Sequence, residues 1–255
     1  MLIATILPTP HLELLRGRPY QMALAHIAAR DDAYADFYLA ESRRGAYVLL
    51  DNGVVETGEA MPISDVLEIA RRIEATEVIL PDSIGNSGKT QFLALLSLLF
   101  ARLDAHAATD RRLMAVPQGK TPEEWRDCLL ELLTLPIDTI GISKFTLQFE
   151  GIESRADLLR VAGEELLEAE VEIHLLGCGA TPWEIAEVER CWPGRVRGAD
   201  SGVAAIAAQA GIDLSQAARR PEGVRLQFDQ EVDEGLLLRN LAYWERAARG
   251  DQSRS

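Results

Sequence analysis

Short apolar runs rich in β-branched residues alternate with amphipathic stretches along most of the chain. From the second run onward the runs begin roughly 25–35 residues apart, which is the length of one strand plus a crossover helix. The pattern predicts seven strands, at Leu2–Leu7, Ala46–Leu50, Glu77–Leu80, Arg112–Val116, Ile137–Ile142, Val171–Leu176 and Arg195–Gly198. A similar run at Val224–Phe228 would supply an eighth strand.

The segments between these runs predict helices. Apolar residues at 66, 69, 70 and 73 share one face of a helix over Val66–Ile73, with Ser64 as its N-cap. Thr121-Pro122 followed by acidic residues marks another helix start, and Thr181-Pro182 repeats that signature. The alternation predicts one α/β domain over residues 1–249, a (β/α)8 TIM-like barrel that is either closed or irregular in its eighth unit. A disordered tail is expected at 250–255.

Length and composition agree with this architecture. The chain has 255 residues, 47% of them hydrophobic, and barrels of this kind have about 250 residues. No uncharged apolar run reaches about 18 residues, so a transmembrane helix is excluded. The three cysteines, Cys128, Cys178 and Cys191, are odd in number and scattered. This usage argues against a disulfide framework and favours a reducing cytoplasm.

The chain is acidic, with 26 Lys+Arg against 40 Asp+Glu and a formal net charge of -14. Proteins that bind nucleic acid by neutralising its phosphates usually present a basic surface. The charge therefore excludes a broad basic face. Two alternatives stay open: a small substrate, or a polymer held in a local groove or with the help of a partner protein.

Polar residues collect at the carboxyl ends of the predicted strands, where barrels and open parallel sheets bind their ligands. Three carboxylates, Asp51, Asp82 and Asp200, lie there with the amide of Gln118 and several glycines. Asp51 and Asp200 are a natural pair for displacement at a glycosidic carbon, because one carboxylate attacks and the other handles the proton. The alternative is that both aspartates cap the following loops by accepting hydrogen bonds from backbone amides.

Other chemistry finds little support. The four histidines are isolated and no Cys-x-x-Cys spacing occurs, so neither a metal site nor a cofactor is predicted. His174, inside a predicted strand, is interpreted as a core residue, and Cys178 has no histidine partner in the sequence. The loop Gly85–Thr90 ends in Gly-Lys-Thr but has two residues between its glycines where a phosphate-binding loop needs four. It is expected to cap a helix that begins near Thr90.

Five short motifs follow one another in order between residues 46 and 211. They are Leu50-Asp51-Asn52-Gly53, Leu80-Pro81-Asp82, Val116-Pro117-Gln118-Gly119, Leu176-Gly177-Cys178-Gly179-Ala180-Thr181-Pro182, and Asp200 with Val203 three residues and Gly211 eleven residues later. This series resembles the tRNA-guanine transglycosylase superfamily, and within it the short phage-encoded members that look like DNA 7-deazaguanine transglycosylases. The resemblance implies a base-exchange glycosyltransferase that replaces guanine in a nucleic acid with a 7-deazaguanine derivative.

The resemblance also implies a role for each matched residue. Asp200 would be the nucleophile at the sugar C1′ and Asp51 the proton-handling carboxylate. The predicted substrate-binding set at the strand ends is Asp82, Gln118, Gly119, Gly141, Leu176 and Gly177. Within it, Asp82 and Gln118 would read the edge of the base, Gly177 would lend backbone contacts, and Leu176 would cover the flat face of the ring.

The chain departs from the family pattern at three places. The tRNA enzymes carry a Cys-x-Cys-x-x-Cys…His zinc site after the nucleophile, whereas no Cys or His follows Cys191 here, so the zinc subdomain is expected to be missing. The arginines after the family's nucleophile are replaced by the alanine-rich stretch 204–208, and its double glycine by Ser143-Lys144. These changes weaken tRNA as the substrate and leave DNA or a smaller nucleoside open. Between the two polymers, DNA is favoured over tRNA as the partner of the protein.

Two rival interpretations stay open. A barrel lyase or aldolase would use Lys144 as a Schiff-base amine, desolvated by Ile142 and Phe145. A non-catalytic subunit would keep the fold and help a partner to bind, although the presence of both Asp51 and Asp200 argues against it. Separately, a partner protein or a homodimer is expected to assist the chain. No membrane partner is expected.

Overall fold

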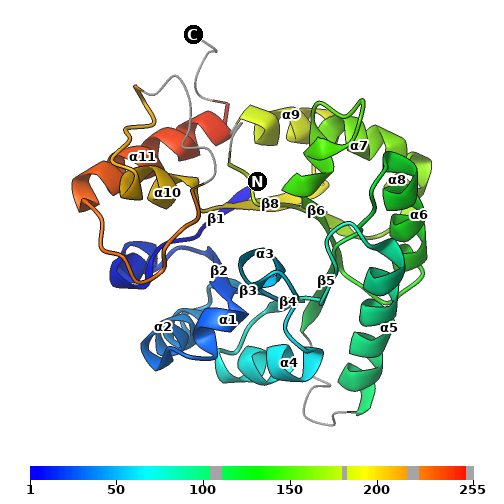
Figure 1. Ribbon diagram of the computed structural model, residues 1–255, viewed down its shortest axis with the longest axis horizontal. Coiled ribbons are helices and arrows are strands. Elements are labelled where there is room, and N and C mark those ends of the chain that lie inside the picture. The colour runs from blue at the N-terminus through cyan, green and yellow to red at the C-terminus, as the bar shows by residue number, and fades with distance from the viewer. Residues whose placement is uncertain (104–110, 180–182, 217–223, 251–255) are drawn as a thin grey trace.

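The computed structural model describes residues 1–103, 111–179, 183–216 and 224–250. Within these ranges eight parallel strands form one sheet, curled into a nearly closed α/β barrel of the (β/α)8 TIM-like kind (Figure 1). The strands are β1 (Leu2–Thr5), β2 (Tyr20–Leu24), β3 (Tyr47–Asp51), β4 (Glu77–Ile79), β5 (Arg112–Ala115), β6 (Thr139–Ser143), β7 (Glu172–Leu176) and β8 (Val196–Ser201). Their spatial order is β1-β8-β7-β6-β5-β4-β3-β2.

The barrel closes between β1 and β2, which are the two ends of this order. β1 pairs with β8, with Ala4 opposite Asp200, and β2 pairs with β3, with Leu24 opposite Asp51. β1 and β2 contact each other without forming a hydrogen-bonded ladder. Because all these strands are parallel, their carboxyl ends share one rim, and Asp51 and Asp200 lie at the same end of the barrel.

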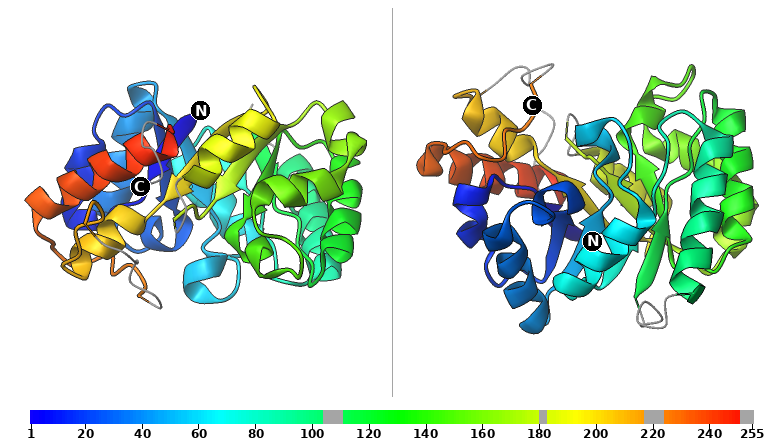
Figure 2. Two further views of the ribbon diagram at one scale, coloured as in Figure 1. Left: turned by 90° about the horizontal axis from the view of Figure 1, so that it is seen from above. Right: turned by 60° about the horizontal axis from the view of Figure 1, so that its bottom comes forward.

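Helices cover the outside of the sheet (Figures 1 and 2). The longer ones are α2 (Asp32–Arg43), α4 (Ile63–Arg72), α5 (Ser87–Leu103), α6 (Pro122–Leu133), α7 (Arg155–Ala162), α9 (Trp183–Cys191), α10 (Val203–Gln209) and α11 (Glu234–Ala248). The shorter ones are the 3-10 helices η1 (Thr9–Leu15) and η2 (Lys144–Gln148) and the helices α1 (Ala25–Ala28), α3 (Val54–Thr57) and α8 (Glu164–Glu168). In Figure 1, α3 lies within the ring of strands rather than in the outer layer.

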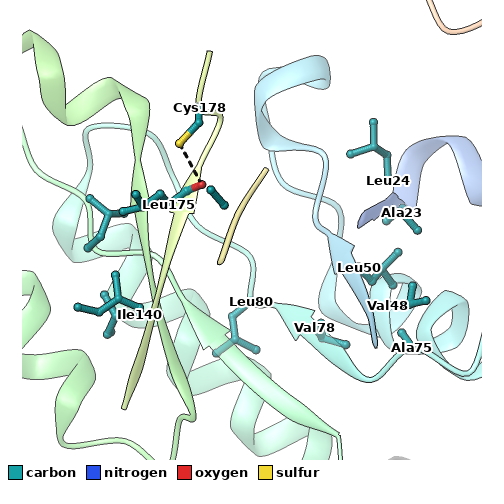
Figure 3. Packing of buried hydrophobic residues seen from close by; sticks show 14 of the residues in the cluster. Ala23, Leu24, Val48, Leu50, Ala75, Val78, Leu80, Ile140, Leu175 and Cys178 are labelled. Atoms are coloured by element: carbon teal, nitrogen blue, oxygen red, sulfur yellow. Dashed lines mark hydrogen bonds between the residues drawn. The ribbon is translucent and has the colours of Figure 1, made fainter. Parts of the chain in front are cut away.

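Two sets of buried side chains hold these layers together. The larger set lies between the sheet and the helices and includes Val48, Leu50 and Ile140 (Figure 3). The smaller set fills the barrel interior and consists of Ala4, Tyr20, Met22, Leu49, Ile79, Met114 and Val116. Along β3, Leu49 points into the barrel, whereas its neighbours Val48 and Leu50 point outward toward the helices. This alternation is the period of two that a strand requires. The interior is therefore a packed floor beneath the strand ends.

All seven strands predicted from the apolar runs are present. The pattern missed β2, because Tyr-Gln-Met-Ala-Leu contains no β-branched residue, although all five of its side chains are buried. The predicted strand at Val224–Phe228 is wrong. The Phe228 carbonyl accepts a hydrogen bond from the N–H of Thr9 at 2.8 Å, and the N–H of Gln227 donates to the Gln209 side chain at 3.0 Å. The segment thus bonds to η1 and α10 instead of to a neighbouring strand.

Cap chemistry predicted one helix start correctly and another wrongly. The Thr121 hydroxyl accepts a hydrogen bond from the N–H of Glu124 at 3.2 Å and caps α6, as predicted. Helix α4 begins before Ser64, with the extended residue Pro62 at the N-cap position, so the predicted Ser64 cap is wrong. The Ser64 hydroxyl donates to the Asp65 carboxylate instead.

Helix α5 begins earlier than predicted. It starts at Ser87 rather than near Thr90, because the Asn86 side chain accepts a hydrogen bond from the N–H of Lys89 at 3.0 Å. The predicted helix start at 181–182 and the predicted tail beyond Gly250 lie outside the described residues. No helix in the described ranges is long and apolar enough to cross a membrane.

Candidate active site

A cavity of about 920 Å³ opens at the carboxyl ends of the strands, a volume within the usual range for small-molecule sites. Six of the predicted site residues line it: Asp51, Asp82, Gln118, Leu176, Gly177 and Asp200. Leu226 and Phe228, from the segment mistaken for a strand, also line the cavity. The structure therefore brings together both predicted catalytic aspartates and most of the predicted substrate-binding set.

Gly119 and Gly141 do not belong to the cavity wall. A Cβ atom at Gly119 would lie 2.5 Å from the backbone nitrogen of Trp125, so this glycine lets α6 start close behind β5. A Cβ atom at Gly141 would lie 2.7 Å from Cδ1 of Leu176. These two predicted contact residues therefore act through packing, Gly141 by making room for the side chain of Leu176.

Asp200 is held near the end of β8 with only 4% of its surface exposed. The N–H of Gly177 donates to both carboxylate oxygens at 3.1 Å, and Nε2 of His174 lies 3.2 Å from Oδ1. Gly177 has a φ of 67°, a left-handed conformation that favours glycine. The backbone turn after β7 and the ring of His174 thus fix the orientation of the carboxylate and place two N–H donors against its negative charge.

His174 is fully buried in β7 and bonded through both ring nitrogens. Nε of Arg197 donates to the Tyr20 hydroxyl at 3.2 Å, and that hydroxyl lies 2.8 Å from Nδ1 of His174. Burial raises the pKa of Tyr20, so the hydroxyl keeps its proton. Because a guanidinium can only donate, the tyrosine proton is directed to Nδ1, and the ring proton is therefore on Nε2, facing Asp200. The interpretation of His174 as a core residue is right about its burial but misses this contact.

Arg197 anchors that chain of hydrogen bonds inside the barrel. Its guanidinium pairs with Glu77 and, at 3.1 Å, with Glu172. It also lies over the rings of Tyr20 and Tyr47, 5.8 and 5.0 Å from their centroids. Removing one partner of a buried ion pair costs several kcal/mol, about 3–5, so these contacts strongly restrain Arg197. The orientation of Tyr20 is restrained with it.

Asp51 ends β3, and its carboxylate accepts a hydrogen bond from the N–H of Gly53 at 2.9 Å. This is the loop-capping contact that the alternative interpretation expects. Burial, together with the negative charges of Glu56, Asp200 and Asp82, raises the pKa of Asp51 to about 8, although the hydrogen bond from Gly53 acts in the opposite direction. Asp51 therefore carries a proton at neutral pH. Capping alone does not require such a shift, whereas acid–base work does.

Asp82 and Gln118 form one rigid unit on the cavity wall. Nε2 of Gln118 donates to one oxygen of Asp82 at 2.6 Å, and Nδ2 of Asn52 donates to the other at 2.8 Å. The N–H of Gly85 donates to Oε1 of Gln118 at 3.1 Å, which fixes which way the amide faces. Burial raises the pKa of Asp82 to about 6. Asn52 lay within a predicted motif but had no predicted role; here it is the fully buried support of Asp82.

A buried arginine that the sequence did not single out ties the ends of β6 and β7 together. Arg155 donates to the carbonyls of Ile142 at 3.0 Å and Leu176 at 2.8 Å, and it pairs with Glu184 at 2.8 Å. It also contacts the sulfur of Cys178, and burial raises the pKa of that thiol to about 12. A thiol in this setting is not a nucleophile. The partners of Arg155 are 13 to 29 residues away in the chain, so no local pattern marks it.

Helix α3 brings a further acid into the cavity. It lies between Gly53 and Gly58, which both have left-handed φ values, 79° and 85°. Glu56 lines the cavity, and its Oε2 is buried without a hydrogen-bond partner among the described residues. Burial raises the pKa of Glu56, while the charges of Lys144 and Arg225 act in the opposite direction. Glu56 can therefore receive a hydrogen bond from a ligand.

Three exposed cations, Arg30, Lys144 and Arg225, line the mouth of the cavity. None of them forms an ion pair within the described part of the chain. The stem of Lys144 covers Gly177, where an added Cβ would lie 2.9 Å from Cδ of the lysine, and its ammonium lies 5.5 Å from the centroid of Phe145. The mouth is thus locally basic in a chain whose net charge is -14.

A comparison of the chain with protein-family models gave no match, and a search of curated proteins gave none either. The assignment of roles therefore depends on the order of the motifs and on the geometry of the cavity.

Proposed function

We propose that this protein is a pentosyltransferase that exchanges guanine in a nucleic acid for a 7-deazaguanine base through a covalent glycosyl–Asp200 intermediate. The observation that carries the proposal is the contrast between two carboxylates on one cavity. Asp200 faces N–H donors from Gly177 and His174, which suit a negatively charged nucleophile. Asp51 has a pKa raised to about 8, which suits a proton donor. Two carboxylates with such different settings are typical of enzymes that act at glycosidic carbons.

The reaction would proceed in two displacements. An oxygen of Asp200 attacks C1′ of the sugar, the bond between C1′ and guanine N9 breaks, and the proton of Asp51 passes to the leaving base. Asp51, now ionised, then takes a proton from the incoming base, whose N9 forms a new bond to C1′ while the bond to Asp200 breaks. The donors on Asp200 stabilise the carboxylate as it leaves. Because the glycosyl ester keeps a good leaving group, the exchange needs no external energy source.

The cavity also offers a place for the base. Met22, Ile79 and Val116 form an apolar floor, and the Asp82–Gln118 unit stands at its edge. A purine-like ring has apolar faces and a hydrogen-bonding edge, and this lining provides for both. Leu176 would cover the other face of the ring, the role that the motif comparison assigns to it.

The basic mouth supports a polymer substrate, since phosphate contacts dominate nucleic-acid affinity. DNA is favoured over tRNA because the alanine-rich stretch that replaces the family's arginines lies in α10, where Ala204, Ala205, Ala207 and Ala208 are buried against the core. That face of α10 therefore offers no phosphate contact. If the DNA is a duplex, the target nucleotide would have to be flipped out of the stack, at a cost of a few kcal/mol.

The rival interpretations receive less support. A Schiff-base lysine needs a desolvated amine, whereas Lys144 is exposed at the cavity mouth. A non-catalytic subunit would have no need of the supports behind Asp200 and Asp82, which here are complete hydrogen-bonded networks. Each observation therefore favours base exchange over the rival to which it applies.

Incubation with labelled guanine tests the proposal. The wild-type protein should place the label in single-stranded or duplex DNA but not in tRNA. Asp200→Asn should fold normally yet exchange at least about a thousandfold more slowly, a barrier increase of about 4 kcal/mol. Denaturing gels should show a covalent protein–DNA species with the wild type and none with the variant.

Each alternative result has a distinct meaning. Label in tRNA alone would restore tRNA as the substrate. Exchange by Asp200→Asn near the wild-type rate would overturn the role of Asp200. Absence of label from DNA, tRNA and free guanosine would reject base exchange altogether.

A further inference from the structure

The outer face of α5 exposes more large apolar side chains than any other described element. Phe92 is 62% exposed, Leu95 56% and Leu99 52%, and Phe100 is 41% exposed beside them. Ile84, in the loop just before α5, is also exposed, but it lines the active-site cavity and does not belong to this face. We call the four α5 residues the α5 stripe. A patch of a few hundred Å² is about as large as the largest apolar patch on a typical monomer, and patches of this size often mark interaction surfaces.

The stripe has the geometry of a helix-packing face. Phe92, Leu95 and Leu99 are spaced at i, i+3 and i+7, so they lie along one side of α5, and they span about 10 Å of its axis. The buried face of the helix is separate, since Ala94 and Ser97 point into the protein. The stripe is therefore not a part of the core that happens to be thinly covered.

The charge around α5 indicates which partner would fit. Residues 87–103 contain no Asp or Glu, although the chain has 40 of them. The adjacent helices expose acids: Asp65 and Glu68 on α4, Asp127 and Glu131 on α6. Two copies with a net charge of -14 repel each other least where neither presents a carboxylate, and α5 provides such a face.

We propose that the α5 stripe is the contact between two copies of this chain, packed antiparallel about a twofold axis near Leu95 and Leu96. That axis lies midway between Phe92 and Leu99, so each phenylalanine would meet the leucine of the other copy, as a self-complementary interface requires. The four side chains expose roughly 300 Å² of apolar surface. A standard interface buries about 800 Å² per partner and is a little over half apolar, so the stripe supplies most of its apolar part. The proposal does not depend on base exchange.

Sedimentation or light scattering from 1 to 200 µM tests the inference on the full chain. The wild type should be dimeric at the upper concentrations, and raising NaCl from 50 to 500 mM should not weaken the dimer, because salt screens the repulsion between the copies. Leu95→Glu places two like charges beside the axis and should weaken dimerisation at least a hundredfold. Leu238→Glu is the matched control, because Leu238 is 46% exposed on α11, and it should leave the dimer intact.

A second measurement covers the case in which Leu95→Glu does not fold. In a Cys191→Ser background, which removes the one exposed cysteine among the described residues, Leu95→Cys should form a covalent dimer on mild oxidation and Leu238→Cys should not. A wild type that stays monomeric at 200 µM would overturn the proposal. A dimer that survives Leu95→Glu, or cross-linking that is equal for the two cysteine variants, would overturn it too.

Discussion

Asp51→Asn should make the protein more stable, and the gain should grow with pH. The usual pKa of an aspartate is about 3.9, whereas the setting of Asp51 raises its pKa to about 8. Between these two values the folded protein binds a proton at Asp51 that the unfolded chain has released. The contribution of Asp51 to the free energy of unfolding is therefore fully present below about pH 4 and is lost as the pH rises from about 4 to about 8. An asparagine cannot ionise and escapes this loss.

The size of the gain follows from the shift. Each pKa unit corresponds to about 1.4 kcal/mol, so a shift of about four units sets an upper bound of about 6 kcal/mol. Asp51 lies at the wall of an open cavity and is partly exposed, so water screens part of this cost. We expect about 2–3 kcal/mol at pH 8, which corresponds to an increase in Tm of roughly 4–12 °C for a chain of this length. Asparagine can still accept the hydrogen bond from Gly53, so the loop should stay in place.

The assay is thermal and urea unfolding of both proteins from pH 5 to pH 8.5. The difference in the free energy of unfolding should increase with pH by no more than about 1.4 kcal/mol per unit. Asp36→Asn, an exposed position on α2, is the control and should show no such trend. If Asp51→Asn is no more stable than the wild type at pH 8, or if its gain does not change with pH, then Asp51 does not carry a raised pKa and the proposed proton donor is wrong.

Other changes at the site also have expected outcomes. The exchange rate should fall as the pH rises through about 8, where Asp51 loses its proton, and Glu56→Gln should move this fall to lower pH in a pH–rate profile because it removes a charge that raises the pKa of Asp51. Tyr20→Phe removes the hydroxyl that fixes the histidine tautomer and should slow exchange about tenfold, with a loss of about 1–3 kcal/mol in the free energy of unfolding. Lys144→Gln with Arg225→Gln should reduce the salt slope of DNA binding by about two units in a titration series, with no change for free guanine. Treatment with a zinc chelator should leave exchange unchanged, because the family's zinc ligands are missing from the sequence; a tightly held zinc lost together with activity would contradict this.

The strands that could be predicted were those with a strong chemical signature. Seven runs rich in β-branched residues correspond to seven strands of the barrel. β2 has no such residue, and its burial on both faces results from closing the barrel, which no local window of sequence contains. Val224–Phe228 has the composition of a strand, but the sheet already consists of the eight strands β1 to β8, so this segment lines the cavity instead. Both errors therefore concern the closure of the barrel, which the local sequence does not encode.

The candidate site likewise contains residues that the sequence predicts and supporting residues that it does not. The rule that ligands bind at strand ends placed Asp51, Asp82 and Asp200 on one cavity from sequence alone. The groups behind them could not be predicted, because their partners are far apart in the chain. Tyr20 reaches His174 across 154 residues, so neither residue carries a local signal of the contact.

The seam between β1 and β2 affects how the barrel can open. Strands inside the sheet are bonded on both sides, whereas β1 is bonded to β8 alone and β2 to β3 alone. Amide hydrogens at the seam should exchange with solvent before those of β5 and β6, since local opening begins where the fewest bonds must break. β1 lines none of the cavity, yet Ala4 lies directly opposite Asp200 on β8. Local opening of β1 would free one side of the strand that carries the candidate nucleophile, so β1 would influence the site without touching a substrate.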